Sequence, residues 1–406
     1  MTSPHSPSPS RPDSAGHVDS SGAPRPQIDA LTGLRFFAAF HVVLYHNSGY
    51  LERAWSTMPE GISNLIHVGY SGVNLFFVLW GFILAYTYAT PTGELKCSRR
   101  RFWIARIARI YPLYLFSLAL AAPAVIHHFF SSNSLSNGLI KLFVSAISAL
   151  TLVQSWLPPL RSIWNAPSWS LSAEAWFYLA FPFIIAPVWR LSRRNAWALG
   201  VVCWLFTFVP WLIAGMALPA DISSAVATEP IGSNSLGVFL RSSPLFRVHE
   251  FVLGIVVARL VLAGATSCET RSPEKPAPWV GPILLAALIA LPYASAKVPR
   301  LWMHGGVFDP IYVLAIVYLI GSRGRVTAWL GRRWWVRLGE ASYGVYILHI
   351  PIRSLMLSAW DEKAQNTMGL EFFLPYAIVV VIGSLAAFRV VEEPARRRIK
   401  AWSTRA

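Results

Sequence analysis

Long apolar stretches, separated by short polar segments, recur along almost the whole chain. A membrane-spanning helix needs about 20 mostly apolar residues, and ten stretches come close to that length. They are 31–50, 67–88, 110–130, 171–189, 196–216, 245–264, 279–296, 307–322, 341–358 and 371–390. Inside a bilayer a helix satisfies its own backbone polar groups. The pattern therefore predicts an all-α, polytopic integral membrane helix bundle with about ten transmembrane helices.

The predicted membrane topology depends on whether an eleventh apolar stretch, 139–157, crosses the membrane. Basic residues concentrate in cytoplasmic loops, and counting this stretch as a span would put every later basic run outside. Leaving it out places the basic runs and both termini in the cytoplasm of a multi-pass cell-membrane protein. The runs are Lys96 with Arg99–Arg101, Arg190 with Arg193 and Arg194, Arg271 with Lys275, Arg323–Arg337, and Arg396–Lys400. We expect 139–157 to be re-entrant or interfacial within an outer excursion, 131–170, where it would be a natural lid.

The composition agrees with a membrane protein and excludes other classes. Hydrophobic residues make up 54% of the 406 residues and charged residues 13%, and the mean hydropathy is +0.47, which is too apolar for a soluble domain. The net charge of +16 falls in short runs between apolar stretches, so it does not indicate nucleic-acid binding. Three cysteines are too few for a disulfide framework. The sequence shows no cluster of metal ligands, and we expect no metal.

The chain is expected to contain one membrane domain between two tails. Residues 1–27 are rich in Ser, Pro and His and contain no apolar run, which predicts a disordered cytoplasmic tail. Residues 28–395 form the predicted membrane domain. Residues 396–406 form a basic cytoplasmic tail.

The first predicted helix carries an arginine and a histidine on one face. Arg35 and His46 are eleven residues apart, which places them about 20° apart around a helix axis and about 16 Å apart along it. We expect both to face a common cavity, whereas His41 lies about 140° away from His46. A neutral imidazole is a natural general base for a hydroxyl. The structural alternative is a histidine that a backbone carbonyl satisfies within the bundle.

The fourth predicted helix opens with Glu174 in its first turn. An ionisable group at that depth is costly unless it is paired. The carboxylate could orient His46 or bind hydroxyls of a substrate. The alternative is that Glu174 completes a helix cap and interacts favourably with the helix dipole.

Arg106 and Arg109 lie three residues apart and share a helix face just before the third predicted span. They could serve only as positive-inside anchors. Guanidinium groups there also suit bidentate binding of phosphates such as those of coenzyme A. Other polar residues in predicted spans are Arg247 with Glu250, Asp309 and His349. For each of these alone, structural pairing inside the bundle is the simpler explanation.

Six sequence blocks, in order, resemble the acyltransferase-3 family of membrane-bound O-acyltransferases and cover most of the chain. They are GLRFFAAFHVVLYH, GVNLFFVLWGFIL at 72–84, RIARIYPLY at 106–114, WSLSAEAWFYLAFP at 169–182, RVHEFVLGIVVARL at 247–260 and LGEASYGVYILHIPI at 338–352. The resemblance implies transfer of an acyl group, often acetyl, from acyl-CoA to hydroxyls of sugars, surface polysaccharides, peptidoglycan or macrolides. Domain 28–395 would then be the acyltransferase domain, with membrane lipid around it.

The resemblance also implies roles for individual residues. The Arg-x10-His pattern of the family maps onto Arg35 and His46, with His46 as the catalytic base. Its Arg-x-x-Arg pattern maps onto Arg106 and Arg109, which implies a role with the CoA donor. The glutamate of its WSL block maps onto Glu174, which makes Glu174, like His46, a candidate catalytic residue.

Three further residues are expected at the acceptor: Trp80, Trp169 and His349. Trp80 departs from the family pattern, in which a small residue, usually Ser, is common. The bulky ring would alter the acceptor pocket rather than the chemistry. The chain ends soon after the tenth span, without the esterase-like domain that some relatives carry, which favours a stand-alone enzyme acting on antibiotics or small glycosides.

Two other classes of function stay open from the residues alone. Intramembrane Arg, Glu and His also mark translocation paths, so a transporter or flippase of a glycosidic or lipid-linked substrate is the main alternative. A membrane scaffold or receptor is the third. Dependence on acetyl-CoA or a longer acyl-CoA separates the enzyme from both, because a carrier releases no free thiol.

Overall fold

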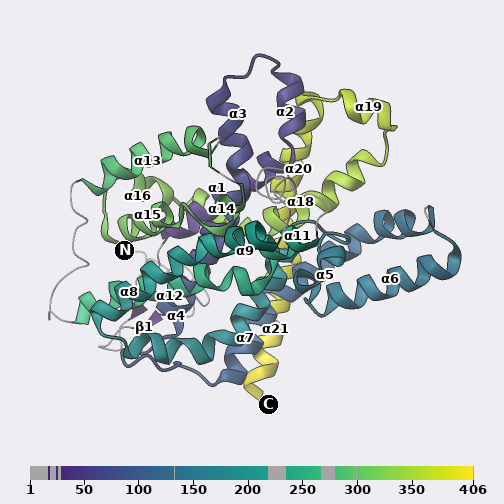
Figure 1. Ribbon diagram of the computed structural model, residues 1–406. Coiled ribbons are helices and arrows are strands. Elements are labelled where there is room, and N and C mark those ends of the chain that lie inside the picture. The colour runs from purple at the N-terminus through teal and green to yellow at the C-terminus, as the bar shows by residue number, and fades with distance from the viewer. Residues whose placement is uncertain are drawn as a thin grey trace, which may run out of the picture.

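The computed structural model describes residues 17–18, 24–25, 29–131, 133–217, 235–266, 279–295, 297–298 and 300–405. Helices make up nearly all of this part of the chain (Figure 1). Within the predicted tail 1–27, His17–Val18 (β1) and Pro24–Arg25 (β2) pair as short antiparallel strands, with His17 opposite Arg25. The remainder of that tail lies outside the described residues, as do Arg271 and Lys275.

All ten predicted spans fall on helices. The α-helices are α1 (Asp29–His46), α2 (Ser48–Ala54), α3 (Glu60–His67), α4 (Gly72–Tyr88), α5 (Arg99–Ser131), α6 (Leu135–Leu150), α7 (Ser168–Arg190), α8 (Arg193–Leu205), α9 (Val209–Ala217), α11 (Ser235–Ser242), α12 (Val248–Thr266), α13 (Val280–Ser295), α14 (Arg300–Gly305), α15 (Asp309–Gly321), α16 (Arg325–Leu330), α17 (Arg333–Glu340), α18 (Ser342–Leu357), α19 (Glu362–Thr367), α20 (Leu370–Ala387) and α21 (Glu393–Arg405). Short 3-10 helices are η1 (Val68–Ser71), η2 (Gln154–Trp156), η3 (Pro158–Leu160), η4 (Phe206–Phe208) and η5 (Pro244–Phe246), and η6 (Phe388–Glu392) is a π-helical turn.

Six helical stretches in the described part of the chain are long and apolar enough to cross a membrane. They are Glu60–Tyr88, Arg99–Ser131, Ser168–Arg190, Arg193–Ala217, Trp302–Gly321 and Leu370–Ala401. The other four predicted spans correspond to α1, α12, α13 and α18, which are 16 to 19 residues long. Two of these four, α13 and α18, have 16 residues each, which is short for a crossing. The prediction of about ten crossings is therefore not confirmed as a count.

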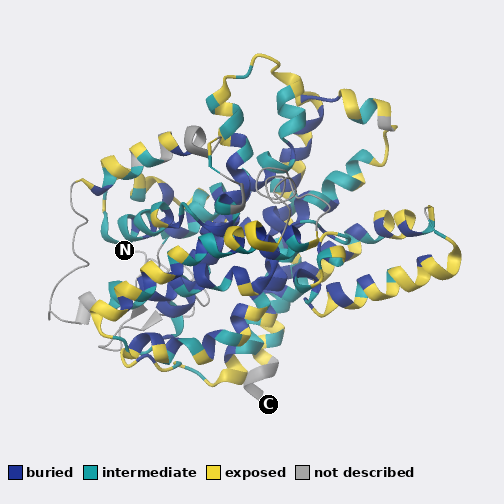
Figure 2. Ribbon diagram, viewed as in Figure 1, coloured by how far each residue is buried: buried dark blue, intermediate teal, exposed yellow. Residues whose placement is uncertain are grey.

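The buried residues concentrate where α1, α4, α12 and α18 meet, and the periphery exposes apolar side chains (Figure 2). In Figure 1, α1 lies in the middle of the molecule, and it packs against α4, α17 and α18. Exposed apolar side chains are what a bilayer accommodates. The polar residues of the first predicted helix are therefore placed in the interior of the bundle.

The close contact between α4 and α12 depends on glycine. Gly81 lies against the carbonyl of Phe251, and Gly254 lies against the carbonyl of Val78, so a Cβ at either position would overlap the facing backbone. Small residues let two membrane helices approach closely. The contact brings the start of α12 next to Asn74 on α4, which is one wall of the site described below.

The eleventh apolar stretch is mostly helical. Its helix, α6, packs against α5, and the two form a hairpin that projects from the rest of the bundle (Figure 1). The hydroxyl of Tyr114 donates to the carbonyl of Ala149 at 2.8 Å, and that of Tyr111 donates to Leu150. These bonds hold the end of α6 on α5. Large apolar side chains on α6 are exposed, including Ile140 and Phe143, as expected for a segment that lies in lipid.

Candidate active site

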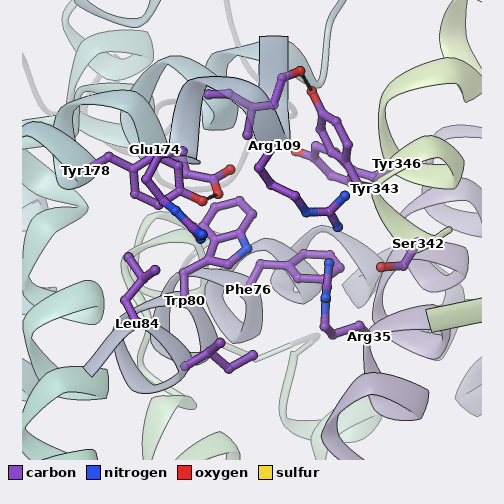
Figure 3. Close-up of a pocket in the computed structure, with 13 residues that line it drawn as sticks. Arg35, Phe76, Trp80, Leu84, Arg109, Glu174, Tyr178, Ser342, Tyr343 and Tyr346 are labelled. Atoms are coloured by element: carbon purple, nitrogen blue, oxygen red, sulfur yellow. Dashed lines mark hydrogen bonds between the residues drawn. The ribbon is translucent and has the colours of Figure 1, made fainter. Parts of the chain in front are cut away.

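Two charged cavities adjoin one another inside the described part of the bundle. The larger encloses about 140 Å³ and is lined by Arg35, Phe76, Trp80, Ile83, Leu84, Arg106, Arg109, Ile110, Glu174, Tyr178, Ser342, Tyr343 and Tyr346 (Figure 3). The smaller encloses about 40 Å³ and is lined by Val42, Tyr45, His46, Tyr70, Val73, Asn74, Arg161, Pro167, Trp169, Arg241, Arg247, His304 and Tyr346. We call them the arginine cavity and the histidine cavity. Tyr346 stands in the wall of both.

Arg106 and Arg109 both line the arginine cavity, as their spacing on α5 predicts. Nη2 of Arg106 donates to the hydroxyl of Tyr88 at 2.7 Å, and its Cζ lies 5.1 Å from the centre of that ring. Arg109 forms an ion pair with Glu392, and its Cζ lies 5.7 Å from the ring centre of Tyr343. Both guanidinium groups are therefore held in place by neighbouring side chains.

Glu392 is a site residue that the sequence analysis did not identify. It is fully buried, although it follows the last predicted span directly. The π-helical turn η6 ends at Glu392 and turns its carboxylate toward Arg109. The signal in the sequence was the acidic pair at 392 and 393 beside an apolar helix, because one such carboxylate facing the bundle needs a cationic partner.

Glu174 lies in the arginine cavity, which differs from the expectation that it would orient His46. Its carboxylate accepts a hydrogen bond from the hydroxyl of Tyr178, one turn further along α7 (Figure 3). It lines the same cavity as Arg35 and Arg106 and does not line the cavity of His46. The sequence gives the depth of a residue along its own helix. It does not give the relative offset of α7 and α1.

His46 is hydrogen-bonded to a second histidine. Its Nδ1 lies 3.1 Å from the carbonyl of Val42 and 3.1 Å from Nε2 of His349. Nδ1 of His349 lies 2.7 Å from the carbonyl of Tyr346. Because a carbonyl only accepts, Nδ1 of His349 is the donor there, and its Nε2 is then free to accept from His46. The network assigns the proton of His46 to Nδ1 and leaves the lone pair on Nε2.

The end of α1 holds His46 at the histidine cavity. His46 is the last residue of α1, and its carbonyl accepts a hydrogen bond from Nη1 of Arg353 at 2.5 Å. The side chain of the next residue, Asn47, donates back to the carbonyl of Val43 at 2.7 Å. These two bonds satisfy backbone groups that the end of a helix leaves without a partner. The imidazole therefore projects from an anchored helix end.

Arg35 and His46 line neighbouring cavities instead of the common cavity that the sequence predicts. Tyr346 lines both cavities. Its hydroxyl donates to the carbonyl of Pro167 at 3.1 Å and is 2.6 Å from Oγ of Ser170. The shared helix face of Arg35 and His46 still turns both toward the bundle interior. Tyr346, which comes from α18, lines both cavities and therefore stands at their common border.

Three arginines that the sequence analysis did not assign to a site, or treated as paired, line the histidine cavity: Arg161, Arg241 and Arg247. Nη2 of Arg247 donates to Oδ1 of Asn74 at 3.0 Å and lies 2.9 Å from Oε2 of Glu250. The expected structural pairing of Arg247 with Glu250 is therefore present.

Two buried carboxyl groups stand behind Arg247. Glu250 and Asp309 are both fully buried. A Cβ built on Gly306, whose φ is +99°, would lie 2.8 Å from Oε1 of Glu250 and would overlap Asp309, so both carboxyl groups border this glycine. Their position explains why the loop before α15 uses glycine here, since a side chain would displace the carboxyl groups.

The remaining predicted site residues separate into three positions. Trp80 lines the arginine cavity, and its ring centre lies 5.8 Å from that of Phe76. Trp169 lines the histidine cavity. His349 is fully buried, lines neither cavity and contacts His46. His41 bonds through Nε2 to the carbonyl of Leu65 at 2.6 Å, away from both cavities, as its position on the helical wheel predicts.

The segment 139–157 was expected to be a lid, but none of its residues is among those that line either cavity. Its last residues, around η2, pack on α7. Oγ of Ser155 is 2.6 Å from Oγ of Ser172, and the hydroxyl of Ser172 also bonds the carbonyl of Leu152 at 2.5 Å. The segment therefore supports the start of α7, which carries Trp169 and Glu174.

The chain is similar to known acyltransferases. Residues 28–389 match the family described as an acyltransferase domain. The chain is 28% identical to acyltransferase MdmB of Streptomyces mycarofaciens, over 91% of this chain and 92% of that protein. It is 23% identical to the putative peptidoglycan O-acetyltransferase YrhL of Bacillus subtilis and to a putative O-acetyltransferase of Staphylococcus aureus. The chain covers 58% and 59% of the length of these two relatives. No solved structure matches the chain.

Proposed function

Because the chain belongs to the acyltransferase family that its residues 28–389 match, we propose that it is an acyl-CoA-dependent membrane O-acyltransferase. The acyl group is acetyl or another short chain, and the acceptor is a hydroxyl of a carbohydrate, glycoside or macrolide-type molecule. The relatives, named as acyltransferases or O-acetyltransferases, support this class of reaction. The observation that carries the proposal is a histidine whose Nε2 has no hydrogen-bond partner among the described residues and which lines a charged cavity.

We assign the donor to the arginine cavity. Guanidinium groups bind phosphates in bidentate fashion, and Arg35, Arg106 and Arg109 supply three of them against the carboxylates of Glu174 and Glu392. One positive charge remains when all five are ionised. A cavity of about 140 Å³ has room for roughly ten water-sized groups. It therefore holds one part of the donor, such as the pantetheine arm or a phosphate pair.

We assign proton transfer to His46. Its Nε2 takes the proton of the acceptor hydroxyl while the hydroxyl oxygen attacks the thioester carbonyl. The tetrahedral intermediate then collapses, the carbon–sulfur bond breaks, and the thiolate receives the proton from His46 to give free CoA. A single displacement of this kind needs no covalent acyl-enzyme.

Tyr346 has to yield for the two substrates to meet, because it lies between the two cavities. The donor acyl group would pass this ring to reach Nε2 of His46. Rotation of one tyrosine side chain breaks the bonds of its hydroxyl to Pro167 and Ser170. The proposal therefore includes a side-chain movement on binding of the donor.

The proposal also includes a membrane topology. We place the protein in the cell membrane with about ten crossing helices and both termini in the cytoplasm, which puts the basic runs on the cytoplasmic side. The donor then enters from the cytoplasm. The location of Arg106 and Arg109 close after the basic start of α5, Arg99–Arg101, supports this direction.

The test is acetyl transfer by the purified full-length protein in lipid nanodiscs. Radiolabelled acetyl-CoA is mixed with candidate glycosides and macrolides, and both the labelled product and the free thiol are measured. We expect His46→Ala to lower transfer by at least ~100-fold, since positioned general bases contribute about that much or more. His127→Ala, an exposed histidine on α5, is the matched control and should stay within twofold. Near-normal transfer by His46→Ala would overturn the assignment.

A further inference from the structure

The lining of the histidine cavity is basic. Three arginines line it, and no aspartate or glutamate of the described residues does. Glu250 pairs with Arg247 from behind the wall, where Asp309 also lies, so the surplus of positive charge rests on the other arginines. Charged side chains inside a membrane bundle are costly and mark substrate sites when they are not fully paired. The lining of this cavity therefore indicates a ligand of negative charge.

Arg161 is the side chain that this surplus rests on. It is 7% exposed, and among the described residues its guanidinium makes no hydrogen bond and no ion pair, only a contact with an aromatic ring. Burial, together with the nearby charge of Arg241, lowers the pKa of Arg161 to about 10. A buried guanidinium beside another cation is stabilised when an anion binds between them.

Trp169 positions two of the guanidinium groups. Cζ of Arg161 lies 5.8 Å from the centre of the indole, and Cζ of Arg247 lies 5.9 Å from it. Arg161 follows η3, and Arg247 precedes α12, so the two arginines reach the ring from separate parts of the chain. Nε and Nη1 of Arg247 are buried and make no hydrogen bond. Together these groups can donate several hydrogen bonds to the oxygens of one anion.

We propose that the histidine cavity binds a carboxylate or phosphate of an acidic hydroxyl acceptor between Arg161 and Arg247. The cavity encloses about 40 Å³, room for about three water-sized groups, which fits a carboxylate and not a whole sugar ring. This inference rests on the proposed function, since it names the class of acceptor whose hydroxyl meets His46. An acceptor with a positive charge near its reacting hydroxyl is disfavoured by the same arginines.

The experiment measures binding of two matched sugars to the full-length protein in nanodiscs, without acyl donor. Methyl β-D-glucuronide and methyl β-D-glucoside differ only in the carboxylate at C6, and affinities are measured by calorimetry. We expect the glucuronide to bind at least tenfold more tightly. Arg161→Gln should reduce this preference to less than twofold and leave binding of the glucoside unchanged, and Arg161→Lys should retain part of it. Arg194→Gln, an exposed arginine on α8, should behave as the wild type.

Equal affinities of the two sugars for the wild type, or an unchanged preference in Arg161→Gln, would overturn the inference. A third result would also overturn it: an equal fall in transfer rate to both sugars in Arg161→Gln without a change in their binding, which would assign the charge to the oxyanion of the reaction. Failure of the proposed function is seen separately. If the protein binds the glucuronide tightly but consumes no acetyl-CoA, the proposed transferase function is contradicted, whereas the proposed anion-binding site is retained.

Discussion

The contact between His349 and His46 makes a specific prediction about catalysis. His349 lines neither cavity, so it does not touch the substrates. It accepts from Nδ1 of His46 and fixes which nitrogen of His46 is free. His349→Ala removes this acceptor and leaves the carbonyl of Val42 as the remaining partner of Nδ1. His349→Gln offers a carbonyl oxygen that can accept in place of Nε2.

The expected loss follows from the hydrogen bonds involved. Because Nδ1 of His46 keeps the carbonyl of Val42 as a partner, His349→Ala removes one hydrogen bond, worth about 0.5–1.5 kcal/mol. An equal loss of transition-state stabilisation corresponds to a ~2- to ~13-fold fall in kcat. The contribution of the general base itself, about 10²- to 10⁴-fold, sets the upper limit. We therefore expect His349→Ala to lower kcat by the factor that the lost hydrogen bond gives, and His349→Gln to recover most of the lost kcat. The KM for acetyl-CoA should stay within twofold, because the donor cavity is intact.

The assay is release of free CoA under saturating donor, with thermal unfolding of each variant as the control for folding. If His349 served only in packing, both His349→Ala and His349→Gln would have a lower melting temperature, but kcat would not be higher in His349→Gln than in His349→Ala. The reasoning fails if folded His349→Ala keeps more than half of the wild-type kcat. It also fails if His349→Gln is no better than His349→Ala.

Two further predictions concern the bundle. Gly254→Ala should lower the yield of folded protein and reduce its melting temperature by several degrees, because the new methyl group overlaps a carbonyl of α4. Gly200→Ala, whose Cβ would lie 3.5 Å from its nearest neighbour, should leave the melting temperature unchanged in the same thermal scan. Equal melting temperatures of the two variants would contradict the tight α4–α12 contact. Glu392→Gln should destabilise the protein by about 3–5 kcal/mol, because it leaves the buried charge of Arg109 without its partner. Glu393→Gln, which breaks the exposed ion pair with Arg397, should cost under ~1 kcal/mol. Similar denaturation midpoints for the two variants would refute the prediction for Glu392.

Much of the helical architecture was predictable because it depends on local pattern. Each run of about 20 apolar residues forms helix, and the spacing of Arg106 and Arg109 places both on one face. The helical wheel also separates His41 from His46 correctly. The number of crossings was less predictable, because four of the ten apolar stretches form helices of only 16 to 19 residues.

The contacts between distant segments could not be predicted. His46 and His349 are 303 residues apart, and Arg109 meets Glu392 across most of the chain. Such pairs depend on the rotation and offset of whole helices, which hydrophobic periodicity leaves undetermined. The expectation that Glu174 orients His46 was wrong for that reason, whereas its alternative role, binding hydroxyls of a substrate, stays a prediction. Arg161 was missed because it lies in a connecting segment, where no periodic pattern indicates the direction of a side chain.

The ring of Tyr346 has a consequence for the permeability of the membrane. Arg35 and His46 lie on one face of α1 and are separated by a rise of about 16 Å, or roughly half the hydrocarbon thickness of a bilayer. A continuous file of water along them would conduct protons and would expose the thioester to hydrolysis. Because the hydroxyl of Tyr346 is held by Pro167 and Ser170, the aromatic ring interrupts that file. In the proposed enzyme, the two charged cavities can then lie inside a bilayer without a continuous water path that conducts protons.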